Sequence, residues 1–62
     1  MTAEQRRSRI SARLHEAQQP ISATVLAREL GVSRQIIVGD VALLRAGGQA
    51  ITATARGYKT DS

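Results

Sequence analysis

Two helix signals separated by a very short connection constrain the fold of this chain most strongly. Ser22 is placed to cap a helix that begins at Ala23, and Gly31 is placed to end it in the left-handed conformation. The apolar face expected for this helix consists of Val25, Leu26 and Leu30. Ser33 then caps a further helix that runs to about Ala46, where two glycines follow. A connection this short prevents the two helices from lying antiparallel. We therefore expect them to cross steeply and to leave one helix prominent at the surface.

The segment before this pair predicts another helix. Thr2 followed by Gln5 is a capping-box pattern, and Pro20 biases its predecessor away from helical geometry, so we place this helix at residues 3–18. The other faces carry arginines, for which a solvated surface is favoured slightly over direct phosphate contact. The residues expected to form the buried stripe are Ile10, Leu14 and Ala17, and the arginines are Arg6, Arg7, Arg9 and Arg13.

The segment after the pair predicts a β-hairpin. Ile51, Ala53 and Ala55 alternate with threonines, which is the repeat of a strand with one buried face. Arg56-Gly57 supplies a turn, and a second short strand follows from Tyr58. Ile21 could add a short extended segment beside this hairpin. The expected fold is mainly α: one domain over residues 1–62, a three-helix winged helix-turn-helix with a C-terminal two-stranded β-hairpin.

Composition limits the interior to aliphatic side chains. The chain has 62 residues with no Phe, Trp or Cys, which favours small, closely packed helices and excludes disulfides and thiolate metal sites. The absence of cysteine is compatible with a reducing cytoplasm. No apolar run approaches the roughly 18 residues of a membrane span, and the N-terminus lacks the apolar run of a signal peptide. We therefore expect a soluble cytoplasmic protein without a membrane partner.

The charge balance points to a polyanionic partner. Nine Lys and Arg residues against five Asp and Glu residues give a net charge of +4, and eight of the nine bases are arginines. Such a surface attracts nucleic acid because neutralised phosphates release condensed counterions. A basic surface that only keeps the chain soluble is the alternative interpretation.

The helix expected at residues 34–46 has an unusual outward face. On a helical wheel Ile37, Val41 and Leu44 form the inward stripe, and we expect Ile36 and Leu43 to widen it on one flank. The opposite arc carries small or uncharged side chains in place of Lys and Glu, with arginines on one shoulder. This arc consists of Gln35, Val38, Gly39, Ala42 and Ala46, and its shoulder of Arg34 and Arg45.

This composition favours a recognition helix. Gly39 costs about 1 kcal/mol relative to Ala inside a helix, so a requirement other than stability accounts for it. Small side chains let a helix lie deep in a groove, Gln35 can pair with an adenine edge, and Val38 or Ala42 can meet a thymine methyl group. Burial of the same arc against another protein is the alternative. DNA is favoured because the flanking residues suit phosphate.

These flanking residues lie at the start of the helix and on the hairpin. Ser33 and Arg34 stand where free amides attract a phosphate, and within the major groove we expect Arg34 and Gln35 to lie nearest the bases. Arg56 lies at the tip of the wing, placed to reach a phosphate or the minor groove, with Lys59 nearby. The candidate DNA-binding residues are therefore Ser33, Arg34, Gln35, Val38, Gly39, Ala42, Arg45, Arg56, Gly57 and Lys59.

With these residues in view, residues 6–59 resemble the helix-turn-helix domain of the bacterial regulators that include biotin-repressor-like and deoxyribose-repressor-like proteins. The stretches GVSRQIIVGDVALLRAGG and ITATARGY are similar to the N-terminal domain of niacin-responsive repressors of NAD biosynthesis. The resemblance implies that Ser33, Arg34 and Gln35 contact double-stranded DNA and that Arg56-Gly57 forms the wing turn. Gly39 departs from the polar residue typical of relatives.

The resemblance also implies what these 62 residues do not carry. Members of the niacin-responsive branch have a C-terminal ligand-binding domain with metal-binding histidines. Effector sensing, metal binding and a homodimer would belong to such a domain outside this chain. The chain is then expected to be a fragment of a longer regulator, with a repressor favoured.

Nothing in the sequence assembles catalytic chemistry. The lone His15 lacks the companions that a metal site needs, and Ser22 and Ser33 serve as helix caps with no partner base. Asp40 lies at the edge of the inward stripe and is expected to pair with an arginine. We expect no enzyme activity, no cofactor and no metal. The alternatives are a protein-interaction winged helix without DNA binding, and the regulatory domain of a bifunctional biotin ligase.

Overall fold

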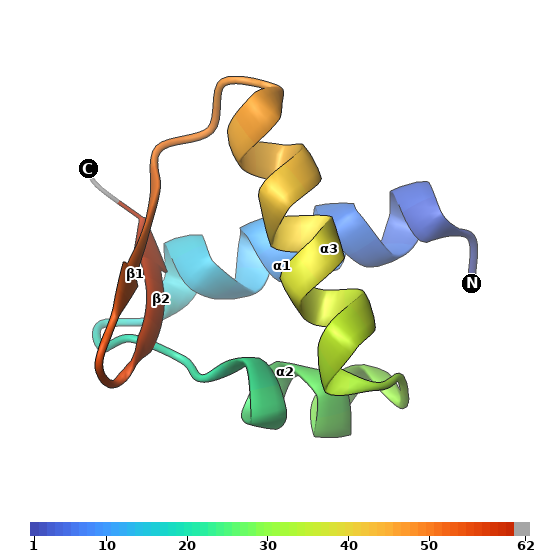
Figure 1. The fold of residues 1–62 in the computed structure, drawn as a ribbon, viewed down its shortest axis with the longest axis horizontal. Coiled ribbons are helices and arrows are strands. Elements are labelled where there is room, and N and C mark those ends of the chain that lie inside the picture. Colours follow the sequence, from blue (N-terminus) through green and yellow to red (C-terminus); the bar gives the residue numbers. More distant parts are fainter. Residues whose placement is uncertain (61–62) are drawn as a thin grey trace.

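The computed structural model describes residues 1–60, and this part of the chain contains three helices followed by an antiparallel pair of strands (Figure 1). The elements are α1 (Ala3–Glu16), α2 (Ala23–Leu30), α3 (Arg34–Ala46), β1 (Ile51–Thr54) and β2 (Gly57–Thr60). In Figure 1, α3 crosses α1, and the hairpin stands at the end of the molecule away from the N-terminus. The predicted winged helix-turn-helix fold is confirmed.

The predicted helix signals act as expected. The hydroxyl of Ser22 accepts a hydrogen bond from the amide of Val25 at 3.1 Å, and the hydroxyl of Ser33 accepts one from the amide of Ile36 at 3.3 Å. Gly31 adopts φ 70°, the left-handed conformation that ends α2. The predicted bounds of α2 and α3 are therefore confirmed.

The first helix is capped as predicted but ends earlier. The amide of Gln5 donates to the Thr2 hydroxyl at 3.1 Å, and the Gln5 side chain accepts from the Thr2 amide at 2.9 Å. The helix stops at Glu16, two residues before the predicted end, because Ala17 is already extended with ψ 137°. The chain straightens here toward Pro20, so that the next residue can reach the hairpin.

The core is small and aliphatic, and each helix contributes to it. Ile10, Leu14, Leu26 and Ile37 are almost completely excluded from solvent. Each such side chain contributes about 1.5–3 kcal/mol of transfer free energy. The remaining buried apolar residues are Ile21, Ala23, Ala27, Val41 and Ile51, with Ala17, Leu30, Val32, Leu44 and Tyr58 packed partly against them.

Three apolar side chains that we expected to face the core are exposed instead. Ile36 and Leu43 were expected to widen the inward stripe of α3, but they are 40% and 58% exposed, and Val25 of α2 is 40% exposed. Asp40 lies between the first two on the same flank of α3 and is itself 3% exposed. This flank is therefore organised around a carboxylate.

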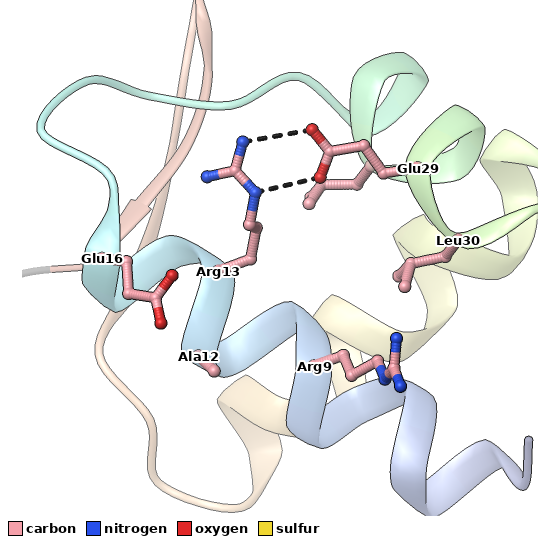
Figure 2. A pocket seen from close by; sticks show the side chains of 7 residues that line it. Arg9, Ala12, Arg13, Glu16, Glu29 and Leu30 are labelled. Carbon is pink, nitrogen blue, oxygen red and sulfur yellow. Dashed lines mark hydrogen bonds and ion pairs between the residues drawn. The ribbon is translucent and has the colours of Figure 1, made fainter.

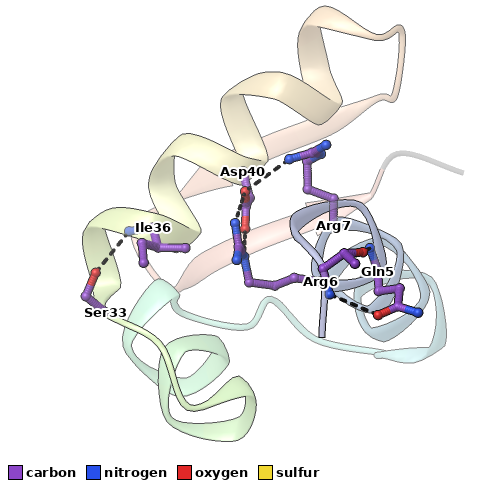
Figure 3. A network of polar contacts seen from close by, with 7 residues as sticks. Gln5, Arg6, Arg7, Ser33, Ile36 and Asp40 are labelled. Carbon is purple, nitrogen blue, oxygen red and sulfur yellow. Dashed lines mark hydrogen bonds and ion pairs between the residues drawn. The ribbon is translucent and has the colours of Figure 1, made fainter.

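The buried carboxylate of Asp40 ties α3 to the first turns of α1 (Figure 3). Arg6 donates to both of its oxygens, with Nη2 3.0 Å from Oδ1, and Nη1 of Arg7 lies 3.7 Å from Oδ1. The predicted pairing of Asp40 is confirmed. The hydrogen bond to this carboxylate raises the pKa of Arg6 above its ordinary value, so the guanidinium stays charged.

A second, more exposed ion pair joins α1 to α2 (Figure 2). Nε and Nη2 of Arg13 donate to the carboxylate of Glu29 at 3.0 and 3.1 Å. The hydrogen bond to Glu29 raises the pKa of Arg13. Three of the four arginines of α1 are thus engaged within the chain, which corrects the expectation that they form a solvated face.

The hairpin is attached to the chain just before α2. The amide of Ile21 donates to the Tyr58 carbonyl at 2.9 Å, and the amide of Tyr58 donates back at 2.8 Å. The predicted placement of Ile21 beside the hairpin is therefore confirmed. A side chain at Gly57, which has φ 137°, would overlap the backbone of Ile21 and lie 2.5 Å from the Ser22 nitrogen.

Two details of the predicted hairpin are wrong. The turn comprises Ala55 and Arg56, while Gly57 already belongs to β2, because the hydroxyl of Thr54 accepts from the Arg56 amide and donates to the Gly57 carbonyl. The expected buried face is also incomplete. Ile51 is buried, whereas Ala53 and Ala55 are exposed.

Within residues 1–60, none of the helices combines the length and the apolar character that a bilayer crossing requires.

Replacing Asp40 by asparagine tests the buried ion pair. Asp40→Asn keeps the side-chain shape but removes the charge that Arg6 and Arg7 face, so the free energy of unfolding should fall by about 2 kcal/mol in urea denaturation. Glu29→Gln makes the same change at the exposed pair and should cost much less. Equal losses in the two variants would contradict the importance of burial at Asp40.

Replacing Gly57 by alanine tests the attachment of the hairpin. Gly57→Ala should lower the free energy of unfolding by more than about 3 kcal/mol, because a strained φ and a steric overlap add. Gly31→Ala is the control: it has a positive φ with open space around it, and should cost only about 1–2 kcal/mol. If the two glycines prove equally replaceable, the close approach of Gly57 to Ile21 does not hold the hairpin.

Candidate nucleic-acid interface

The outward arc of α3 is exposed along its whole length. Gln35, Val38, Gly39, Ala42 and Ala46 are all exposed, and Val38 is 41% exposed. The inward stripe of Ile37, Val41 and Leu44 packs on the opposite side, against the core. The predicted orientation of α3 is therefore confirmed, and these five arc positions bear none of the long charged side chains that usually cover an exposed helix.

No contact within the described chain requires a glycine at position 39. It lies in the middle of α3, and a Cβ at this position would meet no atom within 4 Å outside its own helix. Alanine would fit and would favour the helix by about 0.5–1 kcal/mol. The glycine therefore gives up stability and leaves helix backbone uncovered at the centre of the exposed arc.

Five arginines of the described chain are not engaged in ion pairs: Arg9 of α1, Arg28 of α2, and three on α3 and the hairpin turn. Within residues 1–60, the side chains of Arg34, Arg45 and Arg56 form no salt bridge or hydrogen bond, unlike Arg6 and Arg7. Arg34 and Arg45 belong to α3, and Arg56 lies in the hairpin turn. The positive charge open to a partner is thus concentrated on α3 and the wing.

A cleft brings the wing turn close to the starts of α2 and α3. It has a volume of about 290 Å³ and includes Arg34 and Arg56 in its lining, together with Ser22, Ala23 and Thr24 from the start of α2. The Ile21–Tyr58 backbone pair accounts for this proximity, since it fixes the hairpin beside the residue that precedes the Ser22 cap.

The start of α2 was absent from the candidate residues predicted from sequence. Ser22 was identified there only as a helix cap. Its position beside Arg56 depends on a contact between Ile21 and Tyr58, which are far apart in the chain. The possible extended segment at Ile21 was the signal that could have placed α2 next to the wing.

Three other predicted site residues lie apart from this surface or serve the fold. Lys59 lines a different groove, with His15 and the connection between α1 and α2. Gly57 is half-buried, and its close approach to the Ile21 backbone gives it a structural function. Ser33 is exposed at the start of α3, where its hydroxyl caps the helix.

The described residues offer no metal centre. Across residues 1–60 there is no group of three or more His, Cys, Asp or Glu side chains placed to hold an ion. His15 is exposed, and its Nδ1 lies 2.8 Å from the carbonyl oxygen of Ser11.

Comparison with known proteins agrees with this geometry. A family model described as "HTH domain" matches residues 6–59, which include most of α1, all of α2 and α3, and the hairpin. A Thermotoga maritima protein named "Probable transcription repressor NiaR" is 53% identical over 45 residues, covering 73% of this chain and 26% of that protein. The "Transcription repressor NadR" of Bacillus subtilis is 42% identical over 53 residues, covering 86% of this chain and 29% of that protein.

The chain spans less than a third of the length of either relative. The matched region coincides with the three helices and the hairpin, and the resemblance to winged helix-turn-helix regulators is confirmed. The chain belongs to the helix-turn-helix (HTH) domain family.

Proposed function

We propose that this chain is the sequence-specific double-stranded-DNA-binding domain of a bacterial transcription repressor. Membership of the HTH domain family and the two repressors similar to this chain support the assignment. The observation that carries it is the exposed arc of α3, where Gly39 and its neighbours leave the helix free of long side chains. Such a helix can lie close to base edges in the major groove.

The residues of α3 have distinct parts in this proposal. Gln35 reads an adenine edge through paired hydrogen bonds, while the apolar surfaces of Val38 and Ala42 meet thymine methyl groups. Gly39 lets a base edge approach the helix backbone, and Arg45 contacts a phosphate from the shoulder of the arc. These contacts would give a preference for A·T pairs at the centre of each site.

The proposal extends to the protein in which this domain acts. A repressor works in the bacterial cytoplasm, without chemistry of its own on the DNA, and its effector and dimer contacts would lie in sequence beyond these residues. Two copies would then bind half-sites related by a two-fold axis and about 10 base pairs apart, so that both α3 helices face the same side of the duplex.

A second candidate function rests on exposed apolar side chains. Val38 is 41% exposed on the outward arc of α3, and Ile36 and Leu43 are 40% and 58% exposed on the flank beside Asp40, so another protein could cover either side of the helix. Salt dependence separates the two functions. DNA binding through about five phosphate contacts should give a slope near −4.5 for the logarithm of affinity against the logarithm of salt concentration, while an apolar protein contact should give a nearly flat response.

Selection from random duplex DNA, followed by binding measurements in increasing salt, tests the proposed function. The chain should enrich a defined sequence, and Gln35→Ala should relax its preference at one position at a cost of about 1–3 kcal/mol. Gln18→Ala, at an exposed position in the connection after α1, should leave the preference unchanged. If no duplex is enriched and the salt response is flat, the protein-docking function is favoured instead.

Gly39→Ala separates stability from binding. The free energy of unfolding of the variant, measured by urea denaturation, should rise by up to about 1 kcal/mol, because alanine favours the helix and fits without a clash. Its affinity for the selected duplex should fall about ten-fold, as expected when a base-edge contact is disturbed. Ala12→Gly, at an exposed position of α1, should lower stability and leave affinity unchanged. A Gly39→Ala variant that binds as well as the parent would remove the close approach from the proposal.

A further inference from the structure

We infer that the cleft between the wing and the starts of α2 and α3 holds one DNA backbone phosphate, which Arg34 and Arg56 bind jointly. The inference rests on the proposed DNA-binding function and deepens it. It assigns Arg34 to the backbone, whereas the sequence suggested a contact with bases. It also assigns the wing arginine to the phosphate that Arg34 holds, and excludes a minor-groove contact for it.

The first argument is the charge of the cleft. Its lining includes two guanidinium groups from different elements, Arg34 at the start of α3 and Arg56 in the wing turn, and contains no carboxylate. Neither side chain has an ion pair or a hydrogen bond within residues 1–60, although three other arginines are paired there. Two unneutralised cations that face one concave surface are stabilised by an anion placed between them.

The second argument is the set of hydrogen-bond donors on the opposite wall. Ser22 caps α2 through the amide of Val25, and the amides of Ala23 and Thr24 donate to no acceptor within the described residues. Thr24 is among the residues that line the same cleft. A phosphodiester carries one negative charge on two free oxygens, so it can accept from guanidinium groups on one side and from these donors on the other.

The third argument is that the wall formed by the wing is fixed in advance. Two backbone hydrogen bonds of 2.8 and 2.9 Å join Tyr58 to Ile21, directly before the Ser22 cap. The turn that carries Arg56 is closed by the Thr54 hydroxyl, which accepts from the Arg56 amide at 3.1 Å. The separation between the wing turn and α2 is therefore set by the fold, and a phosphate can bind with little reorganisation of the backbone.

The position of Arg34 on its helix agrees with this assignment. On the helical wheel of α3, Arg34 falls on the shoulder of the arc, between the inward stripe and Gln35. The residue that shares its cleft is Arg56, so Arg34 borders the wing while Gln35 remains on the outward arc. The backbone contact thus sets the register in which Gln35 meets a base edge.

Phosphate neutralisation in the duplex tests the inference. A duplex obtained by the selection is prepared with single uncharged methylphosphonates at successive positions, and its binding to the parent chain and to Arg34→Ala, Arg56→Ala and the double variant is measured. One position should weaken the parent about ten-fold. The same methylphosphonate should have little effect on either single variant, because each variant already lacks one of the two guanidinium groups that hold this phosphate.

The double variant and the salt response give a second readout. If both arginines hold one phosphate, the double variant should be weakened much less than the product of the single effects, and its salt slope should fall by about 0.9, against about 1.8 for two separate phosphates. All sequences should be weakened alike. Arg9→Ala removes the same charge from the α1–α2 groove (Figure 2) and should change affinity less than two-fold.

The outcomes distinguish this inference from the function on which it rests. Failure of the parent chain to bind any duplex would overturn the proposed function, and the inference with it. Binding in which Arg34→Ala and Arg56→Ala are sensitive to different phosphates, or in which Arg34→Ala changes the selected sequence, would overturn the shared phosphate site alone. Circular dichroism spectra of the variants should match that of the parent, because both side chains are exposed and unpaired.

Discussion

The connection between α2 and α3 is so short that these helices cannot lie side by side, and the remaining architecture follows from this constraint. Gly31 ends one helix in the left-handed conformation and Ser33 caps the next. The helices cross, with Leu26 and Ile37 buried where they meet the core. A helix packed in this way has one face inside and a long face outside, and that outer face is the surface on which the proposed function depends.

A domain of this size has a small free energy of unfolding, and the structure shows which residues lower it further. The core is aliphatic and small, and a buried ion pair at Asp40 joins α3 to α1 in place of further apolar packing. Gly39 lowers helix stability with no compensating contact in the described chain, and Leu43 lies largely in solvent. Residues that cost stability without serving the fold concentrate on α3, as expected where binding and stability place different demands on one helix.

Local signals in the sequence were enough to predict the helix starts, the end of α2 and the orientation of α3. Caps and left-handed glycines act within a few residues, so they can be interpreted without knowledge of the rest of the fold. Ile36 and Leu43 were misplaced because hydrophobicity alone did not reveal that Asp40, between them, would take the buried position. The wing cleft was missed, because the expected segment at Ile21 beside the hairpin was not extended to the next residues, which start α2 and lie beside Arg56 in the structure.

The ion pairs of α1 also shape the electric field of the molecule. In number, the four arginines of this helix are offset by Glu4 and Glu16 of the same helix and by Asp40 and Glu29 of its neighbours, which leaves Arg28 of α2 without a counter-charge. The residues from Arg34 to Thr60 carry three arginines and a lysine, and their single acid is the one already paired with α1. The domain therefore carries most of its uncompensated positive charge on α3 and the hairpin. A polyanion would orient the domain during the diffusional encounter, before any contact forms. The domain would then approach with α3 toward the polyanion, and productive collisions would become more frequent.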